Sequence, residues 1–539
     1  MRLLVWLALL PCASFLAHSQ TRPLVNAEDE ALAKAEAAAR AFSAARAWRF
    51  EPTLGATATA TSNRSLSFGS AAERDVVTDI EPRLIVYGRG SSFTLQGNVG
   101  AHLLLNANST PQSRVLPQVL PTGTLTLNAN AIERWLYFDA AATAEQVAAD
   151  PYGARVEAEN PLNKLNSMSY RFSPYLQHAF TPSLSLLARS DNTWSRRRGE
   201  FSATDPRRNS TVQRESVVFE QKPQPFGFSV EGFQEETRYV NSIETLLLIG
   251  RAQAVATYAI DPTFSVGLVG GTEKSKYALT SSTDSIVGTR IVWVPTERTE
   301  LKGVYEQRFF GTGGSLQLKH RSPFFSVAMN VSREPSILGT SFVLDPAGPI
   351  GGDVQTLLNE IFKTRYPNPA DRAIVVGNVI SGLGVPSVLG QPVEVFADYA
   401  QLTSAANISL IFQGSRSTVI ARVYGSRSRQ LRPEDTPFVP TLGIGADNTQ
   451  KGLSLDFNRR LTRTLSVDLG LGLSSIKGLA AATGLSTKNA AIRLGFTQAL
   501  TPKTRATLGT RYQRVDLVAI GQDASAKEIA AFVGLIHSF

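Results

Sequence analysis

The segment 465–474 alternates strictly between apolar residues and small or polar ones. Leucine or valine occupies every odd position, and serine, aspartate or glycine occupies every even position. A period of two with one apolar face is typical of a strand in a membrane β-barrel. Strands of a soluble β-sandwich also alternate, but their polar side faces bulk water and seldom stays this small and glycine-rich. The pattern favours a barrel whose polar residues face the lumen.

The same alternation recurs from Trp48 onward and predicts an all-β chain. Its repeats predict one large antiparallel transmembrane β-barrel of about 22 strands, in a range of roughly 18 to 24. Tight turns are expected on the periplasmic side, at Thr181-Pro182, Asp261-Pro262, Arg321-Ser322-Pro323, Thr462-Arg463-Thr464 and Thr501-Pro502-Lys503. Longer connections are expected on the outer side, at 62–75, 107–121, 145–166, 195–211, 429–450, 475–488 and 517–526.

The last segment, 528–539, is expected to close the barrel. Ile529, Val533 and Leu535 share one parity with Phe539, which predicts the lipid-facing side of this strand. Pairing with the first strand would remove the two free sheet edges, and a bilayer does not tolerate such edges. A terminal aromatic residue is also what barrel-assembly machinery commonly recognises, so Phe539 is the predicted assembly signal.

Residues 1–19 have the pattern of a secretory signal peptide. Arg2 is followed by an apolar run and then by Ala17-His18-Ser19, a small-residue cleavage site. Cys12 is the only cysteine of the chain, so the mature protein is expected to contain no disulfide. Export combined with membrane strands predicts the outer membrane of a Gram-negative bacterium.

Residues 20–47 differ from the strands that follow them. The part 26–47 is rich in alanine and places acidic residues first and basic residues later, an order that complements a helix dipole. This composition predicts a short periplasmic helix, which is either a plain spacer or a plug or docking element. The barrel domain is then 48–539.

One interruption of the strand pattern, at 335–394, is too long for an ordinary turn. Asp353 precedes an apolar stripe at helical spacing over 354–362, and Asn368-Pro369 is suited to start a second helix over 370–379. The insertion fits a lid or an inward-folded constriction. It fits a surface cap over the strand ends slightly better.

The formal charge of +9 does not indicate a nucleic-acid partner. Lysine and arginine are scattered through strands and connections rather than massed on one element. Within the strands, alternation predicts charged side chains on the lumen face at Lys302, Glu306, Arg308, Asp456, Asp468, Arg493 and Arg511. These residues fit a conducting path that tunes selectivity, and they fit equally a packed network of opposite charges.

Two connections are strongly basic and are expected to face outward. One contains Arg196, Arg197, Arg198, Arg207 and Arg208 beside Trp194, and the other contains Arg427, Arg429 and Arg432. Arginines suit an acidic polysaccharide through charge-assisted hydrogen bonds. Contact with the phosphates of the outer leaflet, or simple solubility, is the favoured alternative for these arginines.

Catalysis has little support in the sequence. His102, His178, His320 and His537 are widely separated and lack metal-ligand spacing, and no hydrolase, metalloprotease or phosphate-loop motif is present. We therefore expect no enzymatic activity, no metal and no cofactor. A serine–histidine site assembled across strands is the enzymatic alternative.

Several stretches resemble the outer-membrane β-barrel family associated with PEP-CTERM/exosortase systems. They are WRFEPTLGATATATSN (48–63), VVTDIEPRLIVYGRGSSFTLQGNVGAHL (76–103), ERWLYFDAAATAEQ (133–146), YRFSPYLQHAFTPSLSL (170–186), and YEQRFFG (305–311) followed by LKHRSP (318–323). The resemblance implies an envelope protein linked to exopolysaccharide export or assembly, or to PEP-CTERM surface sorting.

The leading hypothesis is thus a non-enzymatic outer-membrane barrel in exopolysaccharide export, assembly or retention. The alternatives are a general diffusion porin and an outer-membrane enzyme that acts on lipid or glycan. The expected partners are outer-membrane lipid and lipopolysaccharide, the barrel-assembly machinery and a polysaccharide.

Overall fold

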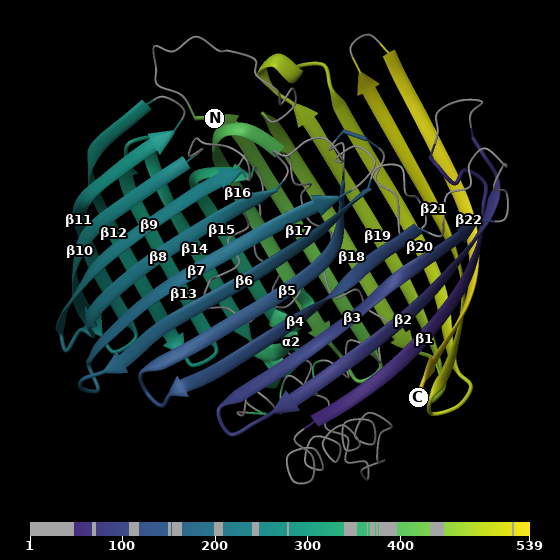
Figure 1. Cartoon of the computed structure of the whole chain (residues 1–539), viewed down its shortest axis with the longest axis horizontal. Coiled ribbons are helices and arrows are strands. Elements are labelled where there is room, and N and C mark those ends of the chain that lie inside the picture. The colour runs from purple at the N-terminus through teal and green to yellow at the C-terminus, as the bar shows by residue number, and fades with distance from the viewer. Residues whose placement is uncertain are drawn as a thin grey trace, which may run out of the picture.

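A closed antiparallel sheet of 22 strands makes up nearly all of the structure (Figure 1). The computed structural model describes residues 48–66, 72–106, 118–148, 152–153, 164–198, 209–239, 247–277, 280–338, 353–363, 365–366, 372, 376, 396–431, 447–519 and 522–539. Each strand pairs with its neighbours in the sequence, and the last strand pairs with the first from Thr53–Ser538 to Thr61–Ala530. The predicted fold class, the strand number and the closing role of the last segment are confirmed.

The strands vary from 10 to 18 residues in length. They are β1 (Trp48–Thr61), β2 (Asp75–Arg89), β3 (Phe93–Asn106), β4 (Gln118–Ile132), β5 (Leu136–Ala148), β6 (Lys164–Ala179), β7 (Leu184–Arg198), β8 (Ser210–Gln221), β9 (Phe226–Tyr239), β10 (Leu247–Asp261), β11 (Phe264–Tyr277), β12 (Thr280–Thr296), β13 (Thr299–Arg308), β14 (Gly311–Arg321), β15 (Phe325–Leu338), β16 (Phe396–Gln413), β17 (Ser417–Gln430), β18 (Asn448–Arg460), β19 (Leu465–Gly478), β20 (Ser486–Ala499), β21 (Thr504–Ala519) and β22 (Gln522–Ser538). A helix, α2 (Asp353–Phe362), lies in the insertion between β15 and β16, and a 3-10 turn, η4 (Ala480–Ala482), joins β19 to β20.

Several strands run farther at their outer ends than the sequence pattern predicts. The connection expected at 517–526 shrinks to the residues between Ala519 and Gln522, and β7 continues through Arg198 into the connection expected at 195–211. The apolar alternation ends at the edge of the bilayer, but backbone pairing needs no lipid-facing side chain and continues past it. The boundaries of these outer connections were therefore predicted wrongly.

The tight turns predicted for the periplasmic side are confirmed as tight turns. At four of them a side-chain hydroxyl accepts a hydrogen bond from the backbone N–H three residues later, at 2.9–3.1 Å; the hydroxyls belong to Thr181, Ser322, Thr462 and Thr501. Asp261 makes the equivalent bond to the N–H of Phe264 at 3.0 Å. These residues satisfy turn donors that would otherwise be open, which is why they mark the turns in the sequence.

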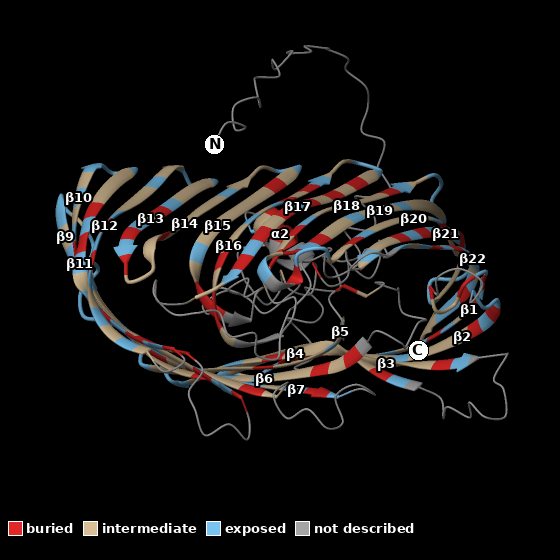
Figure 2. Ribbon diagram, turned by 90° about the horizontal axis from the view of Figure 1, so that it is seen from above, coloured by how far each residue is buried: buried red, intermediate tan, exposed pale blue. Residues whose placement is uncertain are grey.

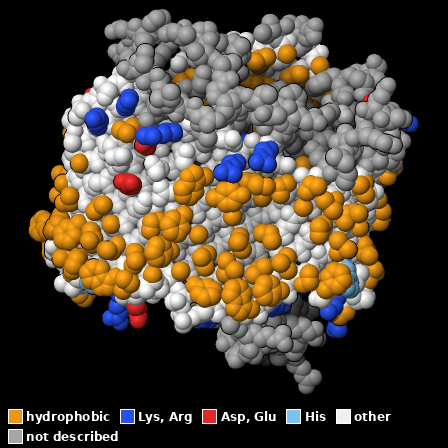
Figure 3. Space-filling view, viewed as in Figure 1, with side chains coloured by type: hydrophobic (Ala, Val, Ile, Leu, Met, Phe, Trp, Pro, Cys, Tyr) orange, Lys and Arg blue, Asp and Glu red, His pale blue; other side chains and the backbone are white. Residues whose placement is uncertain are grey.

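The outer face of the barrel carries an apolar belt. Leu469 and Leu473 on β19 and Leu508 on β21 are 41–60% exposed there, and Ile529 on β22 is 65% exposed. Figure 3 shows the belt on the side formed by the strands that lie in front in Figure 1, with lysine and arginine both above and below it. The predicted lipid-facing parity of β22 is confirmed, and a closed sheet with such a belt is a transmembrane barrel.

Aromatic side chains gather on the outer face near the short-turn end. Trp135 stacks on His178 with ring centroids 3.7 Å apart, and Phe180 meets the same histidine edge-on at 4.8 Å. Phe226 and Phe324 are 72% and 63% exposed at the same level. An aromatic girdle is typical of the membrane–water interface, so this end of the barrel is the periplasmic one by turn length and by side-chain type.

Candidate functional site

The candidate site is the inner wall of the barrel, where alternation places charged side chains of both signs. Arginines from β6 to β13 face carboxylates on the same strand or on strands one to three positions away in the sheet. The arginines are Arg171, Arg189, Arg214, Arg251, Arg290 and Arg308, and the carboxylates, extending to β15, are Asp139, Asp191, Glu231, Glu235, Glu273, Glu306 and Glu334. The numbers of positive and negative charges are nearly equal over this stretch of the wall.

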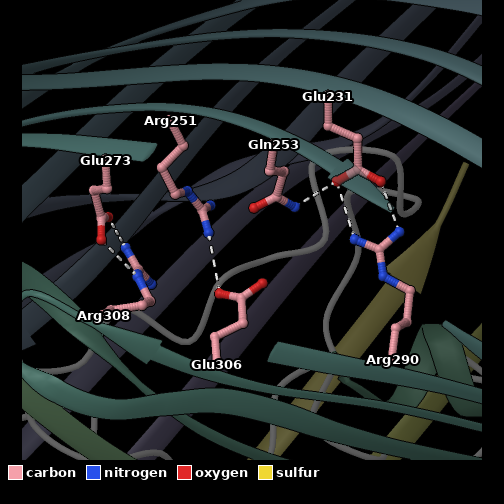
Figure 4. A network of polar contacts seen from close by, with 7 residues as sticks. All are labelled: Glu231, Arg251, Gln253, Glu273, Arg290, Glu306 and Arg308. Carbon is pink, nitrogen blue, oxygen red and sulfur yellow. Dashed lines mark hydrogen bonds and ion pairs between the residues drawn. The ribbon is translucent and has the colours of Figure 1, made fainter. Parts of the chain in front are cut away.

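The densest part of this network spans β9 to β13 (Figure 4). Arg308 and Glu273 form a two-point ion pair in which Arg308 Nε donates to Glu273 Oε2 at 3.0 Å, and their side chains are 6% and 0% exposed. Arg290 donates two hydrogen bonds, of 2.6 and 3.0 Å, to the carboxylate of Glu231. Planar arginine–carboxylate pairs of this kind fix the side chains in orientation as well as in charge.

Polar and aromatic neighbours hold this network in place. Gln253 Nε2 donates to Glu231 at 2.7 Å. Arg251 lies 4.5 Å above the ring of Phe233, and its Nη1 is 3.7 Å from Glu306. Cation–π contact and ion pairing together keep the guanidinium against the wall rather than in the lumen.

A second cluster lies on β5, β6 and β7. Arg189 is 3.1 Å from Asp139 and 2.9 Å from Asp191, and its guanidinium lies 4.8 Å above the ring of Tyr175. Ser173 donates a 2.5 Å hydrogen bond to Asp191. This side of the wall therefore repeats the arrangement of β9 to β13.

The closing seam of the barrel has a buried pair of its own. Arg511 Nη2 lies 2.9 Å from Glu528 Oε1, and both residues are nearly inaccessible at 4% and 1% exposure. Thr61 on β1 donates to the same carboxylate oxygen at 2.6 Å. The three side chains join β21, β22 and β1 across the closure.

Helix α2 packs inside the barrel against the inner wall (Figure 2). Its apolar residues Leu357, Leu358, Ile361 and Phe362 form one buried cluster with Ile411 of β16 and Ile420 of β17, and partly with Ala328 of β15. Ile411 and Ile420 are fully buried by this contact. This contact surface, the seat of α2, is one of several buried apolar clusters on a wall that also carries the charged network.

The seat lies at the periplasmic end, although the insertion enters from the outer end. Ile411 and Ile420 flank the short turn between β16 and β17, and Glu360 of α2 is 3.9 Å from Arg321, at the end of β14. Leu338 pairs with Phe396 at the opposite end, where the insertion begins and ends. The predicted helix is confirmed, and the favoured surface-cap interpretation is wrong for α2, because its apolar stripe finds its partner on the inner wall.

Six of the predicted lumen residues take part in ion pairs. Glu306, Arg308 and Arg511 are buried in the pairs described above, and Asp468 Oδ2 lies 3.8 Å from Arg493 Nε. Lys302 pairs with Glu300 at 2.6 Å but stays 52% exposed, and Asp456 lies on the same face of β18 as buried Ser454 and Asn458. The structure favours a wall-bound network of opposite charges over a row of free charges.

The described part of the first basic connection is mostly strand. Arg196, Arg197 and Arg198 belong to β7, where Arg197 is buried and its two neighbours are exposed on the other face. Arg427 and Arg429 are likewise exposed at the outer end of β17. Arg207, Arg208 and Arg432 lie outside the described residues, as do the predicted signal peptide 1–19, the predicted helix within 20–47 and most of the predicted helix at 370–379.

Some of the strongest network residues were not singled out from the sequence. Glu231, Arg251, Glu273 and Arg290 all have inward parity on β9 to β12. Alternation alone would have placed these four side chains in the lumen. It could not predict which of them form ion pairs, because that depends on the register between strands.

The histidines lie apart from one another. His102 is 2.8 Å from Asp79, His320 is 2.8 Å from the Thr299 hydroxyl, and His537 is 2.9 Å from the Thr504 hydroxyl. Among the residues that the structure describes, no cluster of three histidine, cysteine or acidic side chains has the geometry to hold a metal ion. No described helix is long and apolar enough to cross a bilayer.

The fold and the inner wall define an outer-membrane β-barrel whose lumen is lined by ion pairs. Neither a family model nor a curated protein matches the sequence. Among solved structures, the chain is similar to the siderophore receptor PiuA from Acinetobacter baumannii, at 8% identity and a TM-score of 0.44, over 91% of this chain and 82% of that one. The FrpB iron transporter from Neisseria meningitidis matches at 8% identity and a TM-score of 0.45, over 91% and 82%.

OccK1 from Pseudomonas aeruginosa is similar at 8% identity and a TM-score of 0.34, over 91% of this chain and 99% of that one. Likeness at this level is confined to barrel architecture. It does not indicate a transported substrate or a mechanism for this chain.

Proposed function

We propose that the chain is a non-enzymatic outer-membrane passage for a polar polymer, with α2 as the element that restricts it. The proposed cargo is an exopolysaccharide of a PEP-CTERM/exosortase system in a Gram-negative bacterium. The cargo rests on the family resemblance of the sequence, and the passage rests on the lumen.

The observation that carries the proposal is the seat of α2 on the inner wall. An apolar helix face would not remain in a polar, hydrated lumen without a matching apolar patch, and Ile411 and Ile420 supply one at the periplasmic end. The contact is small enough to be broken and re-formed, because it consists of one short helix face on three strands. A segment seated in this way narrows the passage while leaving the barrel closed.

The inner wall suits an uncharged or mixed-charge glycan better than a free ion. Arg308, Arg290 and Arg189 are each tied to carboxylates, so the wall offers paired charges and hydrogen-bonding groups rather than a field of one sign. A sugar hydroxyl can form a hydrogen bond with a paired arginine or carboxylate without breaking the ion pair.

A strain that lacks this protein tests the proposal. We expect secreted polysaccharide to fall and to accumulate in the periplasm, and the wild-type gene to restore it. Normal polysaccharide export with reduced uptake of small hydrophilic solutes would instead indicate the general diffusion porin. The near balance of charge on the wall is the observation that favours this second candidate.

A further inference from the structure

A shallow hollow of about 750 Å³ lies on the outside of the barrel, over β16 to β21. Its apolar part is lined by Ile408, Val423 and Leu473, which are 42–52% exposed, and by half-buried Leu453, and all four belong to the lipid-facing side of the wall. Its floor contains Gly425, where the absence of a side chain leaves room. The hollow is thus continuous with the surface that the membrane covers.

Three cations rim the hollow on its outer side. Lys451 and Lys488 lie on β18 and β20, and both pair in register with Ser475 of β19, so the two lysines flank the same small residue. Strand spacing places their backbones about 9–10 Å apart, a gap that two lysine side chains can close around one anion. Within the described part of the chain, neither ammonium group has a hydrogen-bond or ion-pair partner.

Arg514 completes the rim from β21. Its Nε donates to both oxygens of Asp516, at 3.0 and 3.1 Å, and this contact orients the guanidinium while leaving its other N–H groups open to a ligand. Lys477, Arg427 and Arg429 are exposed farther out along β19 and β17. The set is strongly cationic, and Asp516 is its one acidic member.

The ligand must therefore combine an anionic head with apolar chains. The apolar belt lies toward the periplasm from Lys451, because Leu453 is the next outward residue on β18 in that direction, about 7 Å away. A phosphate at the rim would have its acyl chains directly over Leu453, Leu473 and Ile408. Outer-leaflet phospholipids and lipid A have this shape, but lipid A carries phosphates on a rigid sugar head that can meet several cations at once.

We propose that this hollow is a specific binding site for the phosphorylated head of one lipid A molecule of the outer leaflet. Lys451, Lys488 and Arg514 bind its phosphate, and the apolar hollow receives an acyl chain. The site lies on the opposite face of the wall from the lumen network, so it is independent of what passes through the barrel.

Native mass spectrometry of the purified barrel in a phosphate-free detergent tests the proposal, with hexa-acylated bis-phosphorylated lipid A as the probe. We expect wild-type protein to retain one lipid A, and Lys451→Gln with Lys488→Gln to weaken binding at least tenfold. Gly425→Leu keeps every charge and adds an apolar side chain at the floor, where an added Cβ would meet nothing closer than 3.9 Å. It should also displace the lipid.

The matched control is Lys274→Gln with Lys276→Gln on β11, which removes two exposed cations at the other end of the barrel's long cross-section (Figure 2). We expect this control to bind like wild type. Heat-modifiable migration on gels verifies that every variant is folded. Equal binding by the Lys451/Lys488 variant, an equal loss in the control, equal retention of dephosphorylated lipid A, or displacement by millimolar inorganic phosphate would each overturn the site.

Discussion

At the scale of single residues, the most exacting feature is the pair of Glu273 and Arg308. Both side chains are almost fully withdrawn from solvent. Two desolvated charges are stable together only through close, two-point geometry, and removal of one partner leaves the other charge buried and unpaired. The pair therefore matters more for keeping the wall ordered than for attracting a solute.

Replacement of Glu273 by Gln should lower the free energy of unfolding by roughly 3–5 kcal/mol. Glu300→Gln is the matched control, because its partner Lys302 is 52% exposed and such a pair contributes only about 0–1 kcal/mol. Urea unfolding in lipid vesicles, followed by tryptophan fluorescence, measures both. Similar losses in the two variants would contradict the assignment of Glu273 as a structural residue.

Parity predicted which charged residues face the lumen but not which of them meet. Glu306 and Arg308 lie on one strand and look like natural partners in the sequence, yet Arg308 pairs with Glu273 two strands away and Glu306 faces Arg251. Such pairs depend on strand register, which is determined by turns and by packing along the whole ladder. Phe539 as an assembly signal stays a prediction.

At the scale of elements, the last strands accommodate an aromatic side chain on their lumen face. Phe532 of β22 faces inward, and its register partner on β21 is Gly509, which in turn lies opposite Gly495 of β20. A Cβ at Gly509 would overlap both the Phe532 ring and the backbone oxygen of Leu494. Gly509 therefore makes room for an inward aromatic ring beside the closing seam, whereas Gly495 makes room for the Asp468 carboxylate.

Gly509→Ala should destabilise the barrel by about 1–3 kcal/mol through overpacking. Gly472→Ala on β19 is the control, because an added Cβ there meets nothing within 4 Å. The fraction that migrates as folded barrel on an unheated gel, measured against urea concentration, compares the two. An unchanged midpoint for Gly509→Ala would refute the close approach.

Strand number was predictable from the sequence, whereas strand ends were not. The alternation of apolar residues in each strand ends at the edge of the bilayer. The apolar pattern of β7 therefore stops at Trp194, although the backbone pairing of this strand continues to Arg198. The turn residues were the better markers, because Thr181 or Thr462 bonds its own turn and needs no tertiary partner. Local chemistry was therefore predicted well and long-range pairing poorly.

At the scale of the whole molecule, the barrel combines a rigid wall with one removable element. The wall is closed by continuous backbone pairing and is braced by ion pairs between strands. Helix α2 contacts that wall through apolar residues of β15, β16 and β17 and through Arg321 at the end of β14. The sequence predicted the helix but not its location, because an amphipathic stripe does not reveal which apolar surface will receive it.

Single-channel recording of a seat variant in planar bilayers tests the central claim most directly. Leu358 is fully buried in the seat, so Leu358→Asp should release α2 and raise conductance or open time several-fold. Lys363→Gln, which changes a 53% exposed side chain just after α2, should behave like wild type. Identical traces for Leu358→Asp and wild type, with both barrels folded, would contradict restriction of the passage by α2.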